Sequence, residues 1–118
     1  MKRLLAPLCA GLMALATPTL AEYQQVNTKA DFVALVTGKS LTRPLVKLQV
    51  LPNGQISGFG AAWEITGKWQ WKAGYLCRSI EWGGDDLGYN CQTVEADGNK
   101  MRITSDKGSG DSAEFKLR

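Results

Sequence analysis

The chain has 118 residues, with 14 Lys and Arg, 11 Asp and Glu, four Trp, three Cys and no His. This length supports one domain and excludes a Rossmann or TIM-barrel enzyme with its own cofactor cleft. The lack of His removes the commonest general base, zinc ligand and pH-dependent switch. We therefore expect no catalytic residue, no metal site and no cofactor.

Residues 1–21 resemble a cleavable export signal. A basic start precedes an apolar run, and the small side chains at positions 19 and 21 suit signal peptidase, which predicts cleavage before Glu22. The apolar run is shorter than the roughly 20 residues that a membrane anchor needs. Lipidation at Cys9 is an alternative fate of the same segment. We expect a periplasmic or secreted protein with one mature domain over residues 22–118 and no membrane span.

Cleavage would also change the charge balance. The signal takes 21 of the 118 residues and two of the 14 basic side chains, which leaves 97 residues with 12 basic and 11 acidic side chains. A chain without an excess of basic residues is poorly suited to binding along the phosphate backbone of a nucleic acid. We therefore expect no nucleic-acid partner. Separately, we expect a monomer.

Two cysteines remain in the mature chain, Cys77 and Cys91. An even pair in an exported chain predicts a disulfide bond. Closing the loop between them would stabilise the fold by roughly 3 kcal/mol. The alternative, a metal or redox pair of thiols, would call for nearby His residues or a C-x-x-C spacing, and the sequence has neither.

After a loose leader at residues 22–27, residues 28–37 predict a short amphipathic helix. Thr28 is a suitable N-cap residue, and Gly38 supplies a stop. The apolar positions that recur at helical spacing are Phe32, Leu35 and Val36.

From residue 46 onward the apolar period changes to two, which predicts strands. The predicted strands cover residues 46–50, 55–59, 63–66, 68–72, 75–80, 89–94, 100–104 and 113–117. No helical pattern is long enough for a parallel crossover, so the fold class is all-β and antiparallel. Closure into a small meander barrel of about eight strands, as in lipocalins or streptavidin, would bury one face and remove the open edges. A β-sandwich is the alternative.

The alternation also predicts the direction of each side chain. The residues expected to face the interior are Val46, Leu48, Val50, Trp63, Ile65, Trp69, Trp71, Met101, Ile103, Phe115 and Leu117. The basic residues expected to face water are Lys47, Lys68, Lys72, Lys100, Arg102 and Lys116.

The predicted interior carries the candidate ligand site. Trp63, Trp69 and Trp71 share one strand face and could line a cavity for an apolar ligand, with Tyr75 and Arg78 as further candidates. The alternative is that the indoles fill the barrel, because an eight-stranded barrel holds little more than its own side chains.

A second candidate site lies between the two cysteines. Residues 81–88 form a Gly-rich polar loop that presents Trp82 beside Glu81, Asp85 and Asp86. A cross-linked loop of this kind could dock a partner protein, because pre-organisation lowers the entropic cost of binding. A solvated hairpin loop and a Ca²⁺ site are the alternatives, and the latter would need further oxygen ligands.

Other patterns give little support for catalysis. The glycines between residues 54 and 60 have the spacing G-x-x-x-G-x-G and strand signals on both sides, unlike a dinucleotide-binding loop. None of the serines has a His partner, and nothing brings Glu64 and Glu81 to glycosidase geometry.

The pattern over nearly all of the mature chain, including the Phe-containing helix that ends in a Thr–Gly step at residues 32–38, resembles a family of small exported proteins from alphaproteobacteria, some of which carry an automatic dihydrodipicolinate reductase label. The residues that carry the resemblance are Gly67, Trp69, Trp71, Gly74, Tyr75, Cys77, Arg78, Asp86, Gly88, Tyr89, Cys91, Gly108 and Gly110. The resemblance implies export and a barrel, and it transfers no active-site residue. A reductase would need a nucleotide-binding βαβ unit. We therefore expect a non-enzymatic periplasmic module that binds a small apolar ligand or an envelope protein, with an enzyme as the alternative.

Overall fold

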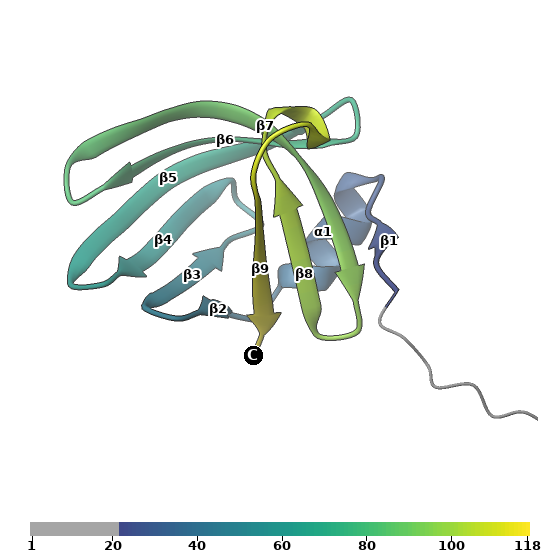
Figure 1. The fold of residues 1–118 in the computed structure, drawn as a ribbon, viewed down its shortest axis with the longest axis horizontal. Helices are drawn as coiled ribbons and strands as arrows, with labels where there is room; N and C mark the ends of the chain where they lie inside the picture. The colour runs from purple at the N-terminus through teal and green to yellow at the C-terminus, as the bar shows by residue number, and fades with distance from the viewer. Residues whose placement is uncertain (1–21) are drawn as a thin grey trace, which may run out of the picture.

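The computed structural model describes residues 22–118, which form a closed antiparallel β-barrel (Figure 1). Each strand pairs with the next one along the chain, and the last strand pairs with the first. The eight barrel strands are β2 (Leu41–Arg43), β3 (Val46–Val50), β4 (Gln55–Gly60), β5 (Trp63–Lys72), β6 (Tyr75–Trp82), β7 (Asp85–Asp97), β8 (Lys100–Thr104) and β9 (Ser112–Leu117). This order confirms the predicted meander barrel rather than the sandwich. The predicted export signal lies outside the described residues.

Two short elements lie outside the barrel wall. Strand β1 (Gln24–Gln25) pairs with the last part of β7, and the 3₁₀ turn η1 (Asp106–Gly108) joins β8 to β9. Neither β1 nor β2 is predicted from the sequence. Strands of two or three residues are too short for an alternating pattern to be read.

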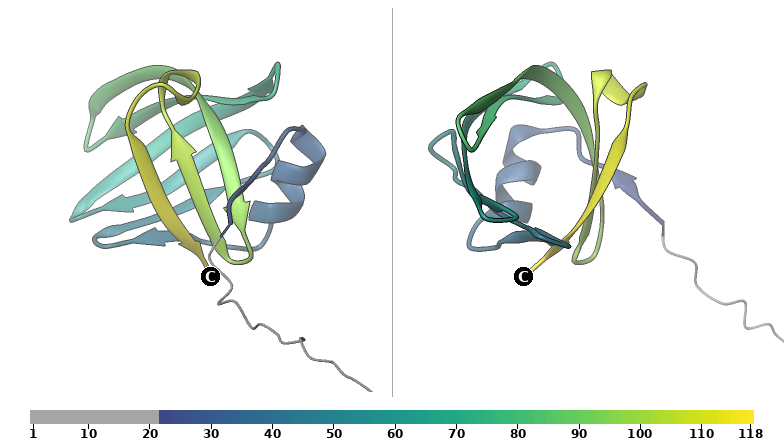
Figure 2. Two further views of the ribbon diagram at one scale, coloured as in Figure 1. Left: turned by 45° about the vertical axis from the view of Figure 1, so that its right-hand side comes forward. Right: turned by 60° about the vertical axis from the view of Figure 1, so that its left-hand side comes forward.

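Helix α1 (Lys29–Val36) covers one end of the barrel (Figure 2). The hydroxyl of Thr28 accepts a hydrogen bond from the backbone N–H of Asp31 at 3.1 Å, which confirms the predicted N-cap. Phe32 and Val36 are buried. The Phe32 ring meets Trp69 edge to face and stacks on Trp71, with ring centroids 5.1 and 5.2 Å apart. The apolar stripe of the helix therefore seals this end of the barrel with aromatic contacts.

The core follows the predicted alternation with one exception. The predicted inward residues that are buried are Leu48, Val50, Ile65, Trp69, Met101, Phe115 and Leu117. Val46, Trp71 and Ile103 are partly buried against them. Trp63 was expected inside, but it is 56% exposed, so that prediction is wrong. It opens β5 at the barrel rim, opposite Gly60, where the neighbouring strand offers no side chain to cover it.

Several strand boundaries differ from the prediction, and two of these differences change the interpretation of a motif. The predicted strands 63–66 and 68–72 form the single strand β5, which continues through Gly67. A Cβ at Gly67 would collide with the carbonyl oxygen of Ser79 on β6, so this glycine permits close strand approach and does not end the strand. Strand β7 already begins at Asp85, which reduces the predicted polar loop to the tight turn at Gly83 and Gly84.

The predicted disulfide is present. Cys77 on β6 and Cys91 on β7 lie directly opposite each other, and their sulfur atoms are bonded. Leu76, on the neighbouring position of β6, belongs to the core, so the disulfide lies on the outer face of the barrel. The bond therefore fixes the register of β6 against β7.

Candidate functional site

The barrel end opposite helix α1 carries two exposed indoles. In a meander, alternate hairpins turn at the same end, which brings the tips of β2–β3, β4–β5 and β6–β7 together. The backbone N–H of Ala61 donates to the carbonyl of Leu45 at 2.6 Å, and that of Gly83 donates to the carbonyl of Glu64 at 2.8 Å. These bonds fix the three tips relative to one another.

Trp63 and Trp82 form the centre of this end. Trp63 is 56% and Trp82 is 37% exposed, and their rings meet edge to face with centroids 5.8 Å apart. The Trp82 Nε1–H donates to the carbonyl oxygen of Gly60 at 2.8 Å. A hollow of about 180 Å³ between them is lined also by Gly83 and Asp85. We call these four residues the tryptophan edge.

Asp85 belongs to the tryptophan edge, and three further carboxylates lie near it on β5, β6 and β7. Glu64, Glu81, Asp85 and Asp86 are all exposed, and Glu81 and Asp86 face each other across β6 and β7. The Asp86 side chain accepts a hydrogen bond from the Gly88 backbone N–H at 2.8 Å. Within residues 22–118 the ion pair between Arg102 and Glu95 is the only one, so these four acids have no cationic partner in that part of the chain. Asp85 places one carboxylate at the hollow itself, whereas Glu81 and Asp86 line a separate hollow together with Lys68.

The other predicted ligand residues lie toward the helix-covered end. Trp69 is only 4% exposed, and its Nε1–H donates to the Leu51 carbonyl at 2.8 Å. The Trp71 Nε1–H donates to the Asn27 carbonyl at 3.4 Å. Both indoles contact Phe32, so the structure brings Trp69 and Trp71 together and leaves Trp63 at the opposite rim.

Arg78 and Tyr75 do not share one surface. Arg78 lies opposite Trp69 on β6, is partly buried, and donates from Nη1 to the Gly88 carbonyl at 3.0 Å. Burial lowers the pKa of its guanidinium. Tyr75 lies two positions before Cys77 on β6, so its side chain faces outward as that of Cys77 does. The Lys107 ammonium lies 5.5 Å from the centroid of its ring.

One exposed residue at this end was missed by the sequence reasoning. Leu45 is 79% exposed in the β2–β3 turn, next to Ala61. Its backbone has a φ of +66°, a left-handed conformation that apolar residues rarely adopt. The signal available in the sequence was the Pro–Leu step at positions 44 and 45, directly before the alternating run.

Two searches for other kinds of site give negative results over the described chain. Between residues 22 and 118, no three His, Cys, Asp or Glu side chains are grouped so as to hold a metal ion. No helix in this range has the length and hydrophobicity needed to cross a bilayer. Comparison with protein-family models, curated protein sequences and solved structures gives no match for this chain.

Proposed function

We propose that this protein is an exported, non-enzymatic binding module that docks a protein of the cell envelope through the tryptophan edge. The observation that carries the proposal is the exposure of two indoles in mutual contact at one end of a rigid barrel. Exposed aromatic clusters mark interaction sites, and Trp is among the residues that contribute most to binding energy at interfaces.

The charge around the indoles indicates the chemistry of the partner. Asp85 lines the hollow, and Glu64, Glu81 and Asp86 lie on the same strands without an ion-pair partner within residues 22–118. A partner that presents an apolar side chain flanked by Lys or Arg would fill the hollow beside Asp85 and neutralise the rim. The register fixed by the disulfide supports this mode, because little ordering would be needed on binding.

A protein partner is favoured over a small apolar ligand. Trp69 and Trp71 already contact Phe32, so the indoles nearest the core are occupied by the protein's own side chain. The hollow at the tryptophan edge, about 180 Å³, is smaller than the several hundred Å³ typical of small-molecule pockets. The proposed architecture is lipocalin-like in its strand order, and the proposed family is that of small exported alphaproteobacterial proteins.

Site-directed photo-crosslinking in the producing cell tests the proposal. A benzoylphenylalanine at position 63 is compared with one at position 34, because Ala34 is exposed on helix α1, at the opposite end of the barrel. We expect a discrete protein adduct from position 63 and none from position 34. The same adducts from both positions, or none from position 63, would overturn the proposal.

Binding measurements with the captured partner then test the role of the indole. We expect Trp63→Ser to weaken binding at least about tenfold and Ala34→Ser, on helix α1, to change it less than about twofold. Equal effects of the two substitutions would contradict docking at the tryptophan edge. Saturable binding of NADPH, or a shift of Trp fluorescence with a panel of apolar ligands, would instead favour the enzyme or the small-ligand alternative.

A further inference from the structure

A groove opens in the barrel wall where β2 separates from β9. The two strands pair only at Leu41 with Leu117 and at Thr42 with Lys116. In the same register Arg43 would lie opposite Phe115, and Pro44 would lie opposite Glu114, at the next position where the two strands would exchange backbone hydrogen bonds. Proline has no backbone N–H to donate, so the ladder cannot continue at this position. Within residues 22–118, the edge of β9 before Lys116 therefore has no partner strand on this side.

The orientation of the free edge follows from the neighbouring hydrogen bonds. The N–H and C=O groups of Arg118 both bond to Ser40, at 2.9 and 2.8 Å. Backbone groups of alternate residues point to the same edge of a strand. Those of Glu114 therefore point into the groove, and β9 offers them to an added strand.

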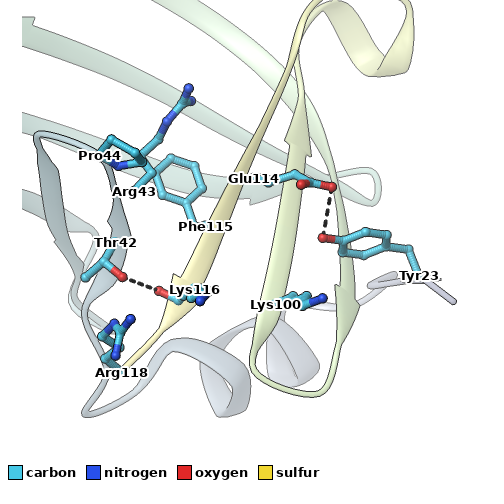
Figure 3. A pocket seen from close by; sticks show the side chains of 9 residues that line it. All are labelled: Tyr23, Thr42, Arg43, Pro44, Lys100, Glu114, Phe115, Lys116 and Arg118. Carbon is cyan, nitrogen blue, oxygen red and sulfur yellow. Dashed lines mark hydrogen bonds between the residues drawn. The ribbon is translucent and has the colours of Figure 1, made fainter. Parts of the chain in front are cut away.

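The groove itself is large and has an aromatic floor (Figure 3). It encloses about 690 Å³, with Phe115 at its base and Tyr23 on the side toward β1. The Arg43 guanidinium lies over the Phe115 ring, 5.7 Å from its centroid. Figure 3 shows Arg43 and Pro44 on one side of the Phe115 ring and Lys116 and Arg118 on the other.

The groove is strongly cationic. Its lining includes Arg43, Lys100, Lys116 and Arg118, and all four are exposed. Lys100 and Lys116 face each other directly across β8 and β9. Like charges in that position repel, so an anion between them would relieve the repulsion.

Its acidic content is small by comparison. Glu114 is the one carboxylate among the lining residues, and it accepts a hydrogen bond from the Tyr23 hydroxyl at 3.2 Å. None of the four cations forms an ion pair within the part of the chain that the structure describes.

We propose that this groove binds an acidic peptide segment of a partner protein in extended conformation, as a strand added to β9 at residues 112–115. Three features point to this one occupant: a free strand edge, four cations without acidic partners, and an apolar floor for alternate side chains. An added strand gains main-chain hydrogen bonds from the edge and specificity from the side chains that face the groove. Because the tryptophan edge is acidic and this groove is basic, the two sites would select partners of opposite charge.

Fluorescence anisotropy with defined peptides tests the proposal. The first probe is a fluorescein-labelled decapeptide that alternates Glu with Val. A matched peptide has Lys in place of Glu, and a third has the Glu–Val sequence with alternate amides N-methylated. We expect saturable binding of the first peptide alone, weakened by added salt. No binding of the first peptide, or equal binding of the N-methylated one, would overturn strand addition.

Substitutions in the groove test whether the peptide binds there. We expect the double change Lys100→Glu and Lys116→Glu to weaken binding at least about tenfold. The control Lys68→Glu, on the far strand β5, is expected to change it less than about twofold. Equal losses in both variants would show non-specific attraction and overturn the site. Trp63→Ser is expected to leave peptide affinity unchanged, so failure of this inference and failure of the proposed function are separable.

Amide hydrogen exchange distinguishes an added strand from a bound small anion. We expect the Glu–Val peptide to slow exchange of the Glu114 amide at least tenfold, because that N–H would enter a new ladder. Glutarate, which carries the charge but no peptide groups, is expected to leave this exchange rate unchanged. Exchange that is unchanged by the peptide, or slowed equally by glutarate, would contradict the proposal.

Discussion

Trp63 and Trp82 are in edge-to-face contact across the rim of the barrel, but only the Trp82 indole is hydrogen-bonded to the backbone of another strand, β4. Its Nε1–H donates to the Gly60 carbonyl at 2.8 Å. A Cβ at Gly60 would approach the Trp82 ring nitrogen to 3.0 Å, so the glycine leaves room for this indole. The two residues therefore have different roles: Trp82 closes the rim, and Trp63 is presented on it.

This difference predicts unequal losses of stability. Trp82→Ala removes a partly buried ring and one hydrogen bond, and we expect a loss of about 2 kcal/mol in the free energy of unfolding. Trp63→Ala removes a mainly exposed ring, and we expect a loss of about 1 kcal/mol or less. Urea denaturation followed by circular dichroism measures both values. Equal losses would contradict the assignment of Trp82 as the anchored residue.

The contacts of Phe32 predict a much larger effect at the opposite end. Phe32 is fully buried between the helix and the sheet and touches both Trp69 and Trp71. We expect Phe32→Ala to cost about 3–5 kcal/mol, which lowers Tm by more than about 12 °C in a domain of this size. The control is Phe59→Ala, which truncates an exposed Phe and is expected to change stability by less than about 0.5 kcal/mol. A Tm for Phe32→Ala within a few degrees of that control would show that the helix does not seal the barrel.

The sequence predicts most of the barrel because its alternation extends over long strands. The alternation assigned Leu48, Trp69 and Met101 to the interior correctly, and the N-cap at Thr28 located the helix. Alternation reports the face of a side chain but not its depth along the barrel. Trp63 therefore shows the inward parity and still lies exposed at the rim.

The candidate sites could be predicted only in part for a related reason. Trp82 and Asp85 were singled out because they occur in a Gly-rich segment. The contact of Trp82 with Trp63 depends on the β5–β6 register, which pairs Ile65 with Trp82 and cannot be deduced from either segment alone. The basic groove was not predicted, because its opening depends on the two-residue pairing of β2 with β9 and on Pro44 at the end of it.

Gly58 provides a test of close strand packing. Its φ is +151°, and a Cβ there would lie 2.9 Å from the Leu48 Cα and still closer to the Lys47 carbonyl oxygen. We expect Gly58→Ala to cost about 2–4 kcal/mol, from backbone strain and from displacement of β3. Gly98→Ala is the matched control, because Gly98 also has a positive φ, +59°, but open space around it, and about 1 kcal/mol is expected. Urea denaturation that gives the two variants the same stability would exclude a steric role for Gly58.

The disulfide is expected to contribute to stability mainly through the loop it closes. Cys77 and Cys91 are 14 positions apart, and joining them restricts the unfolded chain by about 3 kcal/mol. We expect the double change Cys77→Ala and Cys91→Ala to lower the free energy of unfolding by about that amount. A reducing agent should destabilise the native protein by a similar amount and leave the double variant unaffected. A reductant effect on the double variant, or none on the native protein, would contradict this role of the bond.

Tyr23 predicts a stability change at alkaline pH. Partial burial and the hydrogen bond to Glu114 raise the pKa of its phenol above 10.0. A phenol with a raised pKa in the folded state keeps its proton there after the unfolded chain has lost it. Stability therefore falls as the pH rises from the unfolded pKa toward the folded one. Tyr23→Phe removes this dependence and leaves Tyr75 and Tyr89 unchanged. Urea midpoints between about pH 8 and pH 11.5 should show the advantage of the native protein over Tyr23→Phe shrinking above about pH 10. An advantage that stays constant or grows over this range would show that the Glu114 contact does not hold the proton on Tyr23.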